Sequence, residues 1–243
     1  MKSFKWYIGK IQSYIKMQKT IHEMEWADID IVGASSKSNY EALFKHTIKD
    51  KDYIDIQKNV ALLELPDSFE EYLKGKKKQA LRTNMNKAKK SEYYCEYFSG
   101  NEYIDDIMDI NRSSEQRGGR EMEKRYTDRS MVRDFLNTNP LMFGAFSKEG
   151  KLIAYIQLLR VNKMLVINKI LGHADYLENG LMYFIVSELI KTIIEGKNEA
   201  SHIMYAHFLV GRSHAGYTYF KERCGFKGYN VRFHILKDQQ AFN

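Results

Sequence analysis

The sequence has little cysteine, little proline and no long apolar run. Its 243 residues include two prolines and only two cysteines, Cys95 and Cys224. Two cysteines so far apart give neither a disulfide framework nor a metal-binding spacing, so we expect a reducing cytoplasm and no metal. No stretch reaches the length of a membrane span, and the first residues lack the apolar segment of a secretory signal. With 44% hydrophobic and 13% aromatic residues, the chain has enough apolar material for a packed core.

Positive charge is in excess, and much of it lies in one segment. The formal net charge is +7, and residues 74–90 hold eight basic residues and no acid. Clustered cations favour an anionic partner such as a phosphate-bearing donor or the acceptor stem of a tRNA, although a solvated helix face has the same pattern. Because no aromatic residue in the segment could stack on a base, sequence-specific nucleic-acid recognition is not expected.

The chain is organised around two apolar runs, residues 152–159 and 164–171, and the amphipathic helix that follows them. Their lengths and short connection predict an antiparallel pair of buried strands. A polar turn at 175–180 leads into a helix whose apolar residues recur every four positions from Leu181, and Asn179 is expected to cap it. A strand that enters a helix through a turn directs free amides above the sheet edge, where phosphates or an oxyanion can bind.

The predicted order from residue 93 onward is strand, two helices, three strands, helix, strand, helix, strand. This order, together with the sequence Tyr-Phe-Lys-Glu-Arg-Cys-Gly-Phe at 219–226, resembles the GNAT superfamily of acyltransferases over about residues 93–235. The Phe220-Lys221 pair before the glycine and the basic helix around Arg82 resemble the FemAB-like branch, in which two GNAT-like lobes are joined.

This resemblance implies an α/β (α+β) fold of GNAT type, with a central mixed, mostly antiparallel sheet flanked by helices and a truncated N-terminal lobe. We expect residues 1–91 to form the N-terminal lobe and the basic helix, and residues 92–243 to form the acyltransferase domain.

Two departures from the common GNAT pattern concern the acyl donor. The turn at 175–180 holds one glycine and two acids where a glycine-rich loop usually cradles a pyrophosphate, and acids repel that group. Lys221 occupies the position of a tyrosine that in many GNAT enzymes protonates the leaving thiolate. Both departures count against standard coenzyme A binding and favour the other activated acyl donors that FemAB-like relatives can use.

The resemblance also implies roles for particular residues, each of which has a plain structural or solvated alternative. Among the expected catalytic residues, Lys221 is the cation that stabilises an oxyanion. The other two are histidines that could accept a proton, His207 and His173. The expected donor contacts are Leu171, Gly172, Asn179, Gly180, Leu181, His214 and Arg82. The expected acceptor contacts are Arg112, Arg117, Tyr126 and Tyr205.

The predicted function is N-acyl transfer by direct attack of an amine on an activated donor, with acyl-CoA (acetyl-CoA) as the first choice. The acceptor would be a small molecule or a peptide. Two alternatives stay open: a FemAB-like transferase that uses aminoacyl-tRNA and contacts the tRNA through residues 74–90, and a GNAT-fold binding protein without turnover.

Overall fold

The structure is a computed structural model that describes residues 4–45, 47–49, 51–117, 120–138, 140–196, 200–205 and 215–237. The helices are α1 (Phe4–His22), α2 (Ala34–Phe44), α3 (Phe69–Leu73), α4 (Gln79–Lys90), α5 (Ile104–Arg112), α6 (Lys124–Thr127), α7 (Arg129–Leu136), α8 (Leu181–Glu195) and α9 (Ala215–Cys224), with short 3-10 turns η1 (Lys76–Lys78) and η2 (Ala174–Asn179). The strands are β1 (Glu25–Ile31), β2 (Tyr53–Glu64), β3 (Tyr94–Phe98), β4 (Gln116–Arg117), β5 (Arg120–Glu121), β6 (Leu141–Phe146), β7 (Leu152–Val161), β8 (Met164–Gly172), β9 (His202–Tyr205) and β10 (Lys227–Ile235).

One eight-stranded sheet runs through the molecule in the order β1-β10-β2-β9-β8-β7-β6-β3, and β4 and β5 form a separate ribbon. The β1–β10 and β8–β9 pairs are parallel, and the other neighbours in the large sheet are antiparallel. The predicted fold class, a mixed and mostly antiparallel sheet flanked by helices, is confirmed.

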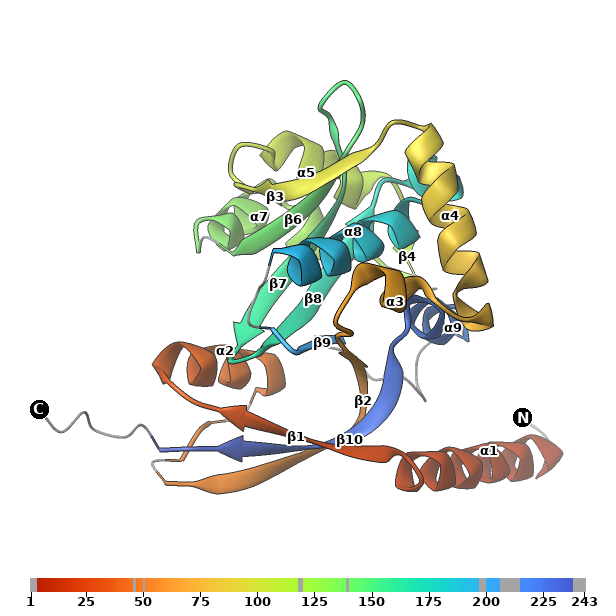
Figure 1. Ribbon diagram of the computed structural model, residues 1–243, viewed down its shortest axis with the longest axis vertical. Coiled ribbons are helices and arrows are strands. Elements are labelled where there is room, and N and C mark those ends of the chain that lie inside the picture. The colour runs from red at the N-terminus through yellow and green to blue at the C-terminus, as the bar shows by residue number, and fades with distance from the viewer. Residues whose placement is uncertain are drawn as a thin grey trace, which may run out of the picture.

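The N-terminal part of the chain is built into this sheet. Strand β2 lies between β10 and β9, and β1 forms the edge beyond β10 (Figure 1). The predicted boundary at residue 91 therefore falls within one continuous sheet rather than between two separate ones.

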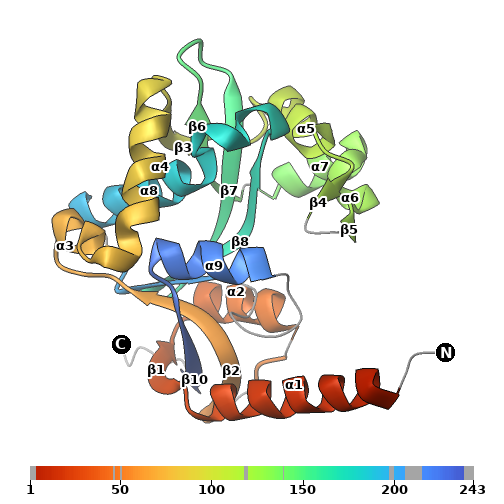
Figure 2. The same ribbon diagram turned by 90° about the vertical axis from the view of Figure 1, so that its right-hand side faces the viewer.

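Helices cover both faces of the sheet. Figure 2 shows α8 and α4 on one side of β6, β7 and β8, with α5, α6 and α7 on the other. Each face of the sheet buries its own hydrophobic cluster, the first around α8 and the second around α5 and α7. A third cluster lies where α2 packs against the part of the sheet that holds β1 and β10. The two predicted apolar runs are β7 and β8, and nearly all of their residues are buried.

The parallel strands β8 and β9 pair over the first part of β8. Their last described pair is Ile167 with Tyr205, whereas β8 continues to Gly172. The residues directly after this pair, from Asn168 to Ile170, are only half-buried. Beyond them, β8 leads through η2 into α8.

Helix α4 packs across that N-terminus and covers it. The main chain of Asn84 lies so close to Gly180 that a Cβ atom there would overlap it, and the Lys87 ammonium donates to the carbonyl oxygen of Glu178. The predicted cap is wrong: Asn179 ends η2 and donates from Nδ2 to the Tyr93 hydroxyl at 3.2 Å, while Gly180, with φ of 76°, occupies the cap position. A donor cannot approach these amides as the sequence suggested.

The long helix α1 was not anticipated from the sequence. It extends from the edge of the sheet, and most of its length lies outside the body of the molecule (Figures 1 and 2). Its anchor is at its C-terminal end, where Asn230 Nδ2 donates to the carbonyl of Ile21 at 2.8 Å.

Gly180→Ala tests the packing of α4 on α8. A left-handed backbone costs an alanine about 1–2 kcal/mol, and overlap with a packed main chain costs a similar amount, so we expect a loss of about 2 to 4 kcal/mol in the free energy of unfolding. Urea denaturation measures it. The control is Gly9→Ala, since a Cβ at Gly9 meets nothing within 4 Å. Equal stability of the two variants would show that α4 does not pack closely here.

Candidate functional site

A buried lysine and a buried tyrosine meet where β9 ends. Lys221 of α9 is 6% exposed and Tyr205 of β9 is 5% exposed, and the lysine Nζ lies 4.9 Å from the centre of the tyrosine ring. Burial lowers the pKa of Lys221 to about 8. The Tyr205 hydroxyl is buried and has no hydrogen-bond partner among the described residues. A lysine that exchanges its proton near neutral pH and an unused hydroxyl are suited to proton transfer and to stabilising negative charge.

A second lysine, Lys78, is half-buried at the C-terminal end of α9. Lys78 Nζ and the Tyr72 hydroxyl both donate to the carbonyl oxygen of Cys224, at 2.9 and 2.8 Å. Burial lowers the pKa of Lys78 to about 8 as well. The sequence analysis counted Lys78 among the cations available to an anionic partner, but its amine holds the end of a helix instead.

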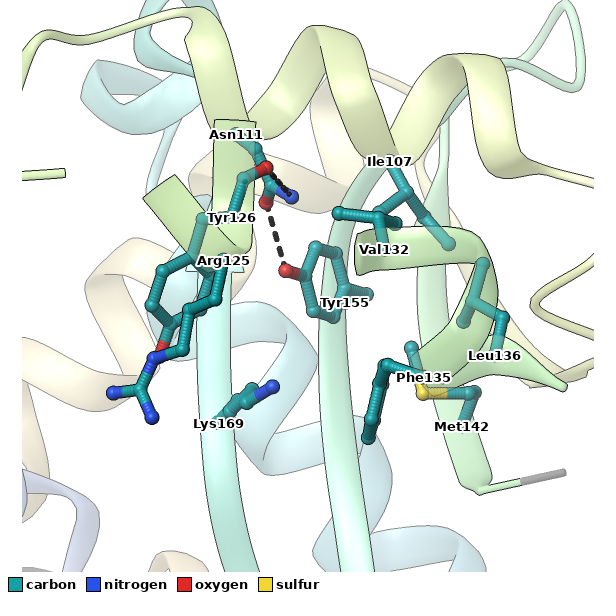
Figure 3. A pocket seen from close by; sticks show the side chains of 10 residues that line it. All are labelled: Ile107, Asn111, Arg125, Tyr126, Val132, Phe135, Leu136, Met142, Tyr155 and Lys169. Carbon is teal, nitrogen blue, oxygen red and sulfur yellow. Dashed lines mark hydrogen bonds between the residues drawn. The ribbon is translucent and has the colours of Figure 1, made fainter. Parts of the chain in front are cut away.

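A small pocket lies on the opposite face of the sheet, among α5, α6, α7, β6, β7 and β8 (Figure 3). Lys169 Nζ lies 4.0 Å from the ring centre of Phe135 and 5.1 Å from that of Tyr126, and burial lowers its pKa, with Arg125 as a further cause. The Tyr155 hydroxyl donates to Asn111 Oδ1 at 2.8 Å. The residues that line the pocket include two cations and no carboxylate.

The two groups lie near the last described pair of β8 and β9. Tyr205 belongs to that pair, and Lys169 lies two residues beyond it on β8. Tyr205 packs in the cluster around α8, while Tyr126 and Phe135 pack in the cluster around α5 and α7. A buried lysine, Lys221, and a half-buried one, Lys169, therefore lie near this pair on opposite faces of the sheet.

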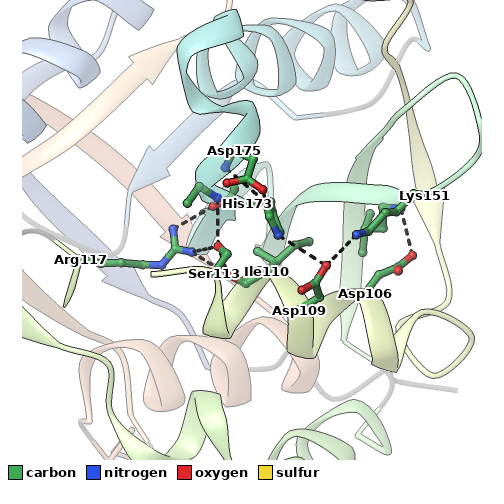
Figure 4. Close-up of polar contacts among 11 residues, drawn as sticks. Asp106, Asp109, Ile110, Ser113, Arg117, Lys151, His173 and Asp175 are labelled. Atoms are coloured by element: carbon green, nitrogen blue, oxygen red, sulfur yellow. Dashed lines mark hydrogen bonds and ion pairs between the residues drawn. The ribbon is translucent and has the colours of Figure 1, made fainter. Parts of the chain in front are cut away.

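His173 is locked in an ion-pair network (Figure 4). Its Nδ1 accepts from the Asp175 amide at 3.3 Å, and its Nε2 lies 3.5 Å from the carboxylate of Asp109, which also binds Lys151 at 2.7 Å. The hydrogen bond from Lys151 is the main cause that holds the pKa of Asp109 below its usual value. The His173 amide donates to Ile153 at 2.8 Å, so it is not free to bind an oxyanion.

Two predicted acceptor contacts hold main-chain carbonyls. Arg117 donates to Gly172 at 2.9 Å and to Ile110 at 2.6 Å, and Arg112 donates to Thr127 at 2.7 Å. Both side chains tie the C-terminal end of α5 to neighbouring segments.

The predicted donor contacts lie apart from Lys221. Leu171 and Leu181 are buried, and a Cβ at Gly172 would overlap the Met182 side chain. Arg82 donates to the carbonyls of Leu73 and Gly75, at 2.6 and 3.0 Å. His207 and His214 lie outside the described residues.

Of the residues in these two groups, the sequence analysis named Lys221, Tyr205 and Tyr126 but not Asn111, Tyr155 or Lys169, and the roles of all six stay predictions. One signal for Lys169 was present, because it is a charged residue inside an apolar run that reads as a buried strand. Nothing in the sequence pairs Asn111 with Tyr155, which are 44 residues apart.

A family model described as phosphatidylglycerol lysyltransferase, C-terminal, matches residues 63–215. The chain belongs to this family. The match includes α8, the residues that line the pocket, and strands β8 and β9, and it ends at the first residue of α9. No curated protein matches the chain.

Solved structures share the fold at low identity. A conserved protein of unknown function from Bacteroides thetaiotaomicron has a TM-score of 0.50 and 15% identity, with 81% of this chain and 66% of that one covered. The C-terminal domain of a putative lysylphosphatidylglycerol synthetase from Agrobacterium fabrum has a TM-score of 0.47 and 16% identity, with coverages of 74% and 60%. L-PGS from Bacillus licheniformis has a TM-score of 0.47 and 14% identity, with coverages of 77% and 63%. The chain thus spans less than two thirds of the length of each.

Membership of a family named for lysyl transfer agrees with the predicted acyltransferase class, and the mixed, mostly antiparallel sheet agrees with the predicted fold class. The FemAB-like branch, the acyl donor, the amine acceptor and the roles of the individual site residues stay predictions. None of the helices in the described part of the chain combines the length and the apolarity that crossing a bilayer requires.

Lys221→Met tests the burial of the lysine through its pH dependence. The folded-state pKa, about 8, is below the ordinary 10.5, so the unfolded chain binds more protons between these values. The contribution of Lys221 to stability therefore rises with pH across that window. From neutral pH to about pH 9 the wild type should gain about 1 kcal/mol relative to the variant, as measured by urea denaturation. A difference that does not change with pH would place Lys221 in contact with water.

Proposed function

We propose that this chain transfers an aminoacyl group from an aminoacyl-tRNA to a hydroxyl of an anionic phospholipid headgroup. The observation that carries the proposal is the position of α4, which covers the N-terminus of α8 with one face and presents lysines to solvent on the other. The matched family supports the lipid acceptor, since its name pairs a lysyl group with phosphatidylglycerol.

The covered N-terminus of α8 argues against coenzyme A held by a pyrophosphate loop. Gly180 packs on the main chain of Asn84, and the turn before it carries the carboxylates of Asp175 and Glu178. A pyrophosphate would need both the space and the free amides, and it would meet two like charges there.

The exposed face of α4 and η1 suits the phosphates of a tRNA. Lys78 and Arg82 bind main-chain carbonyls, but the other basic residues of this segment are exposed. The exposed lysines are Lys74, Lys76, Lys77, Lys87, Lys89 and Lys90, of which Lys87 also donates to Glu178. Contacts of this kind give strong, salt-dependent affinity without base recognition.

The chemistry we propose takes place beside Lys221 and Tyr205, at the last described pair of β8 and β9. The acceptor hydroxyl attacks the ester carbonyl, a C–O bond to the lipid forms, and the C–O bond to the tRNA ribose breaks. Lys221 and the Tyr205 hydroxyl stabilise the oxyanion of the tetrahedral intermediate. Because the pKa of Lys221 is about 8, its amine can receive the proton of the attacking hydroxyl, and the ammonium so formed can return that proton to the leaving ribose oxygen.

We place the aminoacyl side chain in the pocket of Figure 3. Arg125 is paired with Glu123 at 2.9 Å, but Lys169 lines the pocket with no carboxylate among the lining residues, so a cationic lysyl side chain would meet its like charge. An uncharged aminoacyl group such as alanyl fits this electrostatic environment better than the lysyl group of the family name.

A transfer assay tests the function directly. We expect label from alanyl-tRNA, and less from lysyl-tRNA, to become extractable with phosphatidylglycerol vesicles. Lys221→Met should lower turnover by about 10²-fold, the loss expected for one preorganised electrostatic contact. Lys227→Met, at an exposed lysine of β10, is the matched control and should leave turnover unchanged. Transfer from acetyl-CoA, with none from either aminoacyl-tRNA, would overturn the proposal.

The salt dependence of tRNA binding tests α4 separately. Replacing Lys76, Lys77, Lys89 and Lys90 by Gln should lower the slope of log affinity against log salt by about 1 for each lysine that contacts a phosphate. Fluorescence anisotropy with labelled tRNA measures the slope. The control replaces two lysines that are exposed elsewhere, Lys148 and Lys163. The same slope in both variants would mean that the lysines of α4 form a solvated helix face and do not contact the tRNA.

A further inference from the structure

Helix α1 has a continuous apolar face that the protein leaves uncovered. Five large side chains at positions 7, 8, 11, 14 and 15 lie within one stripe of the helix, and four of them are 54 to 60% exposed. These residues are Tyr7, Ile8, Ile11, Tyr14 and Ile15. Most of α1 lies outside the body of the molecule in both views (Figures 1 and 2). Contiguous exposed apolar surface on this scale marks an interaction site.

The side of α1 that faces the body is a different one. Met17 and Ile21 are half-buried, and the carbonyl of Ile21 accepts the hydrogen bond from Asn230. At 100° per residue these two side chains stand beside the exposed stripe rather than within it. The stripe therefore remains open while the helix is anchored.

The charges of α1 identify the occupant. From residue 4 to residue 22 the helix has no Asp or Glu, while Lys10 and Lys19 are exposed on the two flanks of the apolar stripe and Lys16 is exposed on the polar side. Trp6 stands beside Tyr7 and under the ammonium of Lys10, with the Nζ 5.5 Å from the ring centre. Lysines and aromatic rings that border an apolar stripe are the composition of a helix lying in the interface of an anionic bilayer.

A second copy of the chain fits this face less well. Two such helices paired along the stripe would bring their lysines together, and within the helix no acid is present to pair with them. The ion pair of Lys19 lies at the end of the helix, with Glu23 at 3.8 Å.

We propose that α1 is a membrane-surface helix, with Tyr7, Ile11, Tyr14 and Ile15 inserted among the headgroups of an anionic bilayer and the lysines at its phosphates. The proposal concerns the docking of the whole protein, goes beyond the transfer reaction and does not depend on it. It would also keep the protein at the surface where a lipid acceptor lies.

Sedimentation with vesicles tests the proposal without any activity. The full chain should bind vesicles of equimolar phosphatidylcholine and phosphatidylglycerol and bind phosphatidylcholine vesicles weakly. Replacing both flanking lysines, Lys10 and Lys19, by Gln should weaken binding by about fivefold per lysine, the effect of one basic residue at an anionic surface. The double variant Ile11→Ser and Ile15→Ser should lose binding by at least about tenfold.

The matched control is the double variant Gln12→Ser and Thr20→Ser, which places serines on the polar side of the same helix and should bind like the wild type. Both apolar positions are exposed, so circular dichroism and the thermal midpoint should stay as in the wild type. Vesicle binding by the Ile11 and Ile15 variant equal to wild type would overturn the proposal. Failure of the wild type to bind anionic vesicles would also overturn the proposal. This includes the case in which the wild type forms a dimer instead and the Ile11 and Ile15 variant abolishes that dimer.

If the transfer assay fails while vesicle binding depends on the stripe, the results support the role of α1 and contradict the proposed reaction. If transfer succeeds in detergent while the stripe variants bind vesicles normally, the results support the reaction and contradict the role of α1.

Discussion

The packing of α4 across the start of α8 determines how the rest of this structure can work. Gly180 is the contact point, because only a residue without a Cβ can lie against the main chain of Asn84 while it adopts a left-handed conformation. The contact closes the helix N-terminus that would otherwise offer amides to a phosphate. It also fixes the direction of α4, so that one side of that helix is buried through Leu81, Met85 and Ala88 while its lysines face solvent.

The same arrangement accounts for the positions of Lys78 and Lys221. Residues just before α4 bring Tyr72 and Lys78 to the last carbonyl of α9, and that contact holds α9 in place. Lys221 then lies inside the protein beside Tyr205, where burial lowers its pKa. Burying a charged amine costs folding free energy. A role of the Lys221 amine in the reaction would account for that cost.

Much of the fold could be predicted because its signals are local. The apolar runs of β7 and β8 and the four-residue spacing that begins at Leu181 each describe one element, and each was predicted correctly. Strand β2 shows that a local pattern can mislead, because the polar pair Lys58 and Asn59 interrupts its apolar residues. The structure forms one strand across this pair, with Asn59 at a positive φ of 62°.

The site could be predicted only in part, because its contacts join distant segments. A basic run does not reveal that Lys78 binds Cys224, 146 residues away, or that Arg82 binds its own preceding turn. The capping role assigned to Asn179 failed because the glycine after it takes the cap position. Helix α1 was missed because its apolar face is turned away from the core, so that its pattern matches no buried element.

The central claim is that the donor binds on the exposed face of α4 rather than at the N-terminus of α8. Lysine footprinting by acetylation and mass spectrometry tests it most directly, with and without tRNA or coenzyme A. The account predicts that tRNA protects Lys76, Lys77, Lys89 and Lys90 while Lys148 and Lys163 stay reactive, and that coenzyme A changes none of them. Unchanged labelling of α4 in saturating tRNA, or protection of Lys87 beside Glu178 by coenzyme A alone, would contradict it.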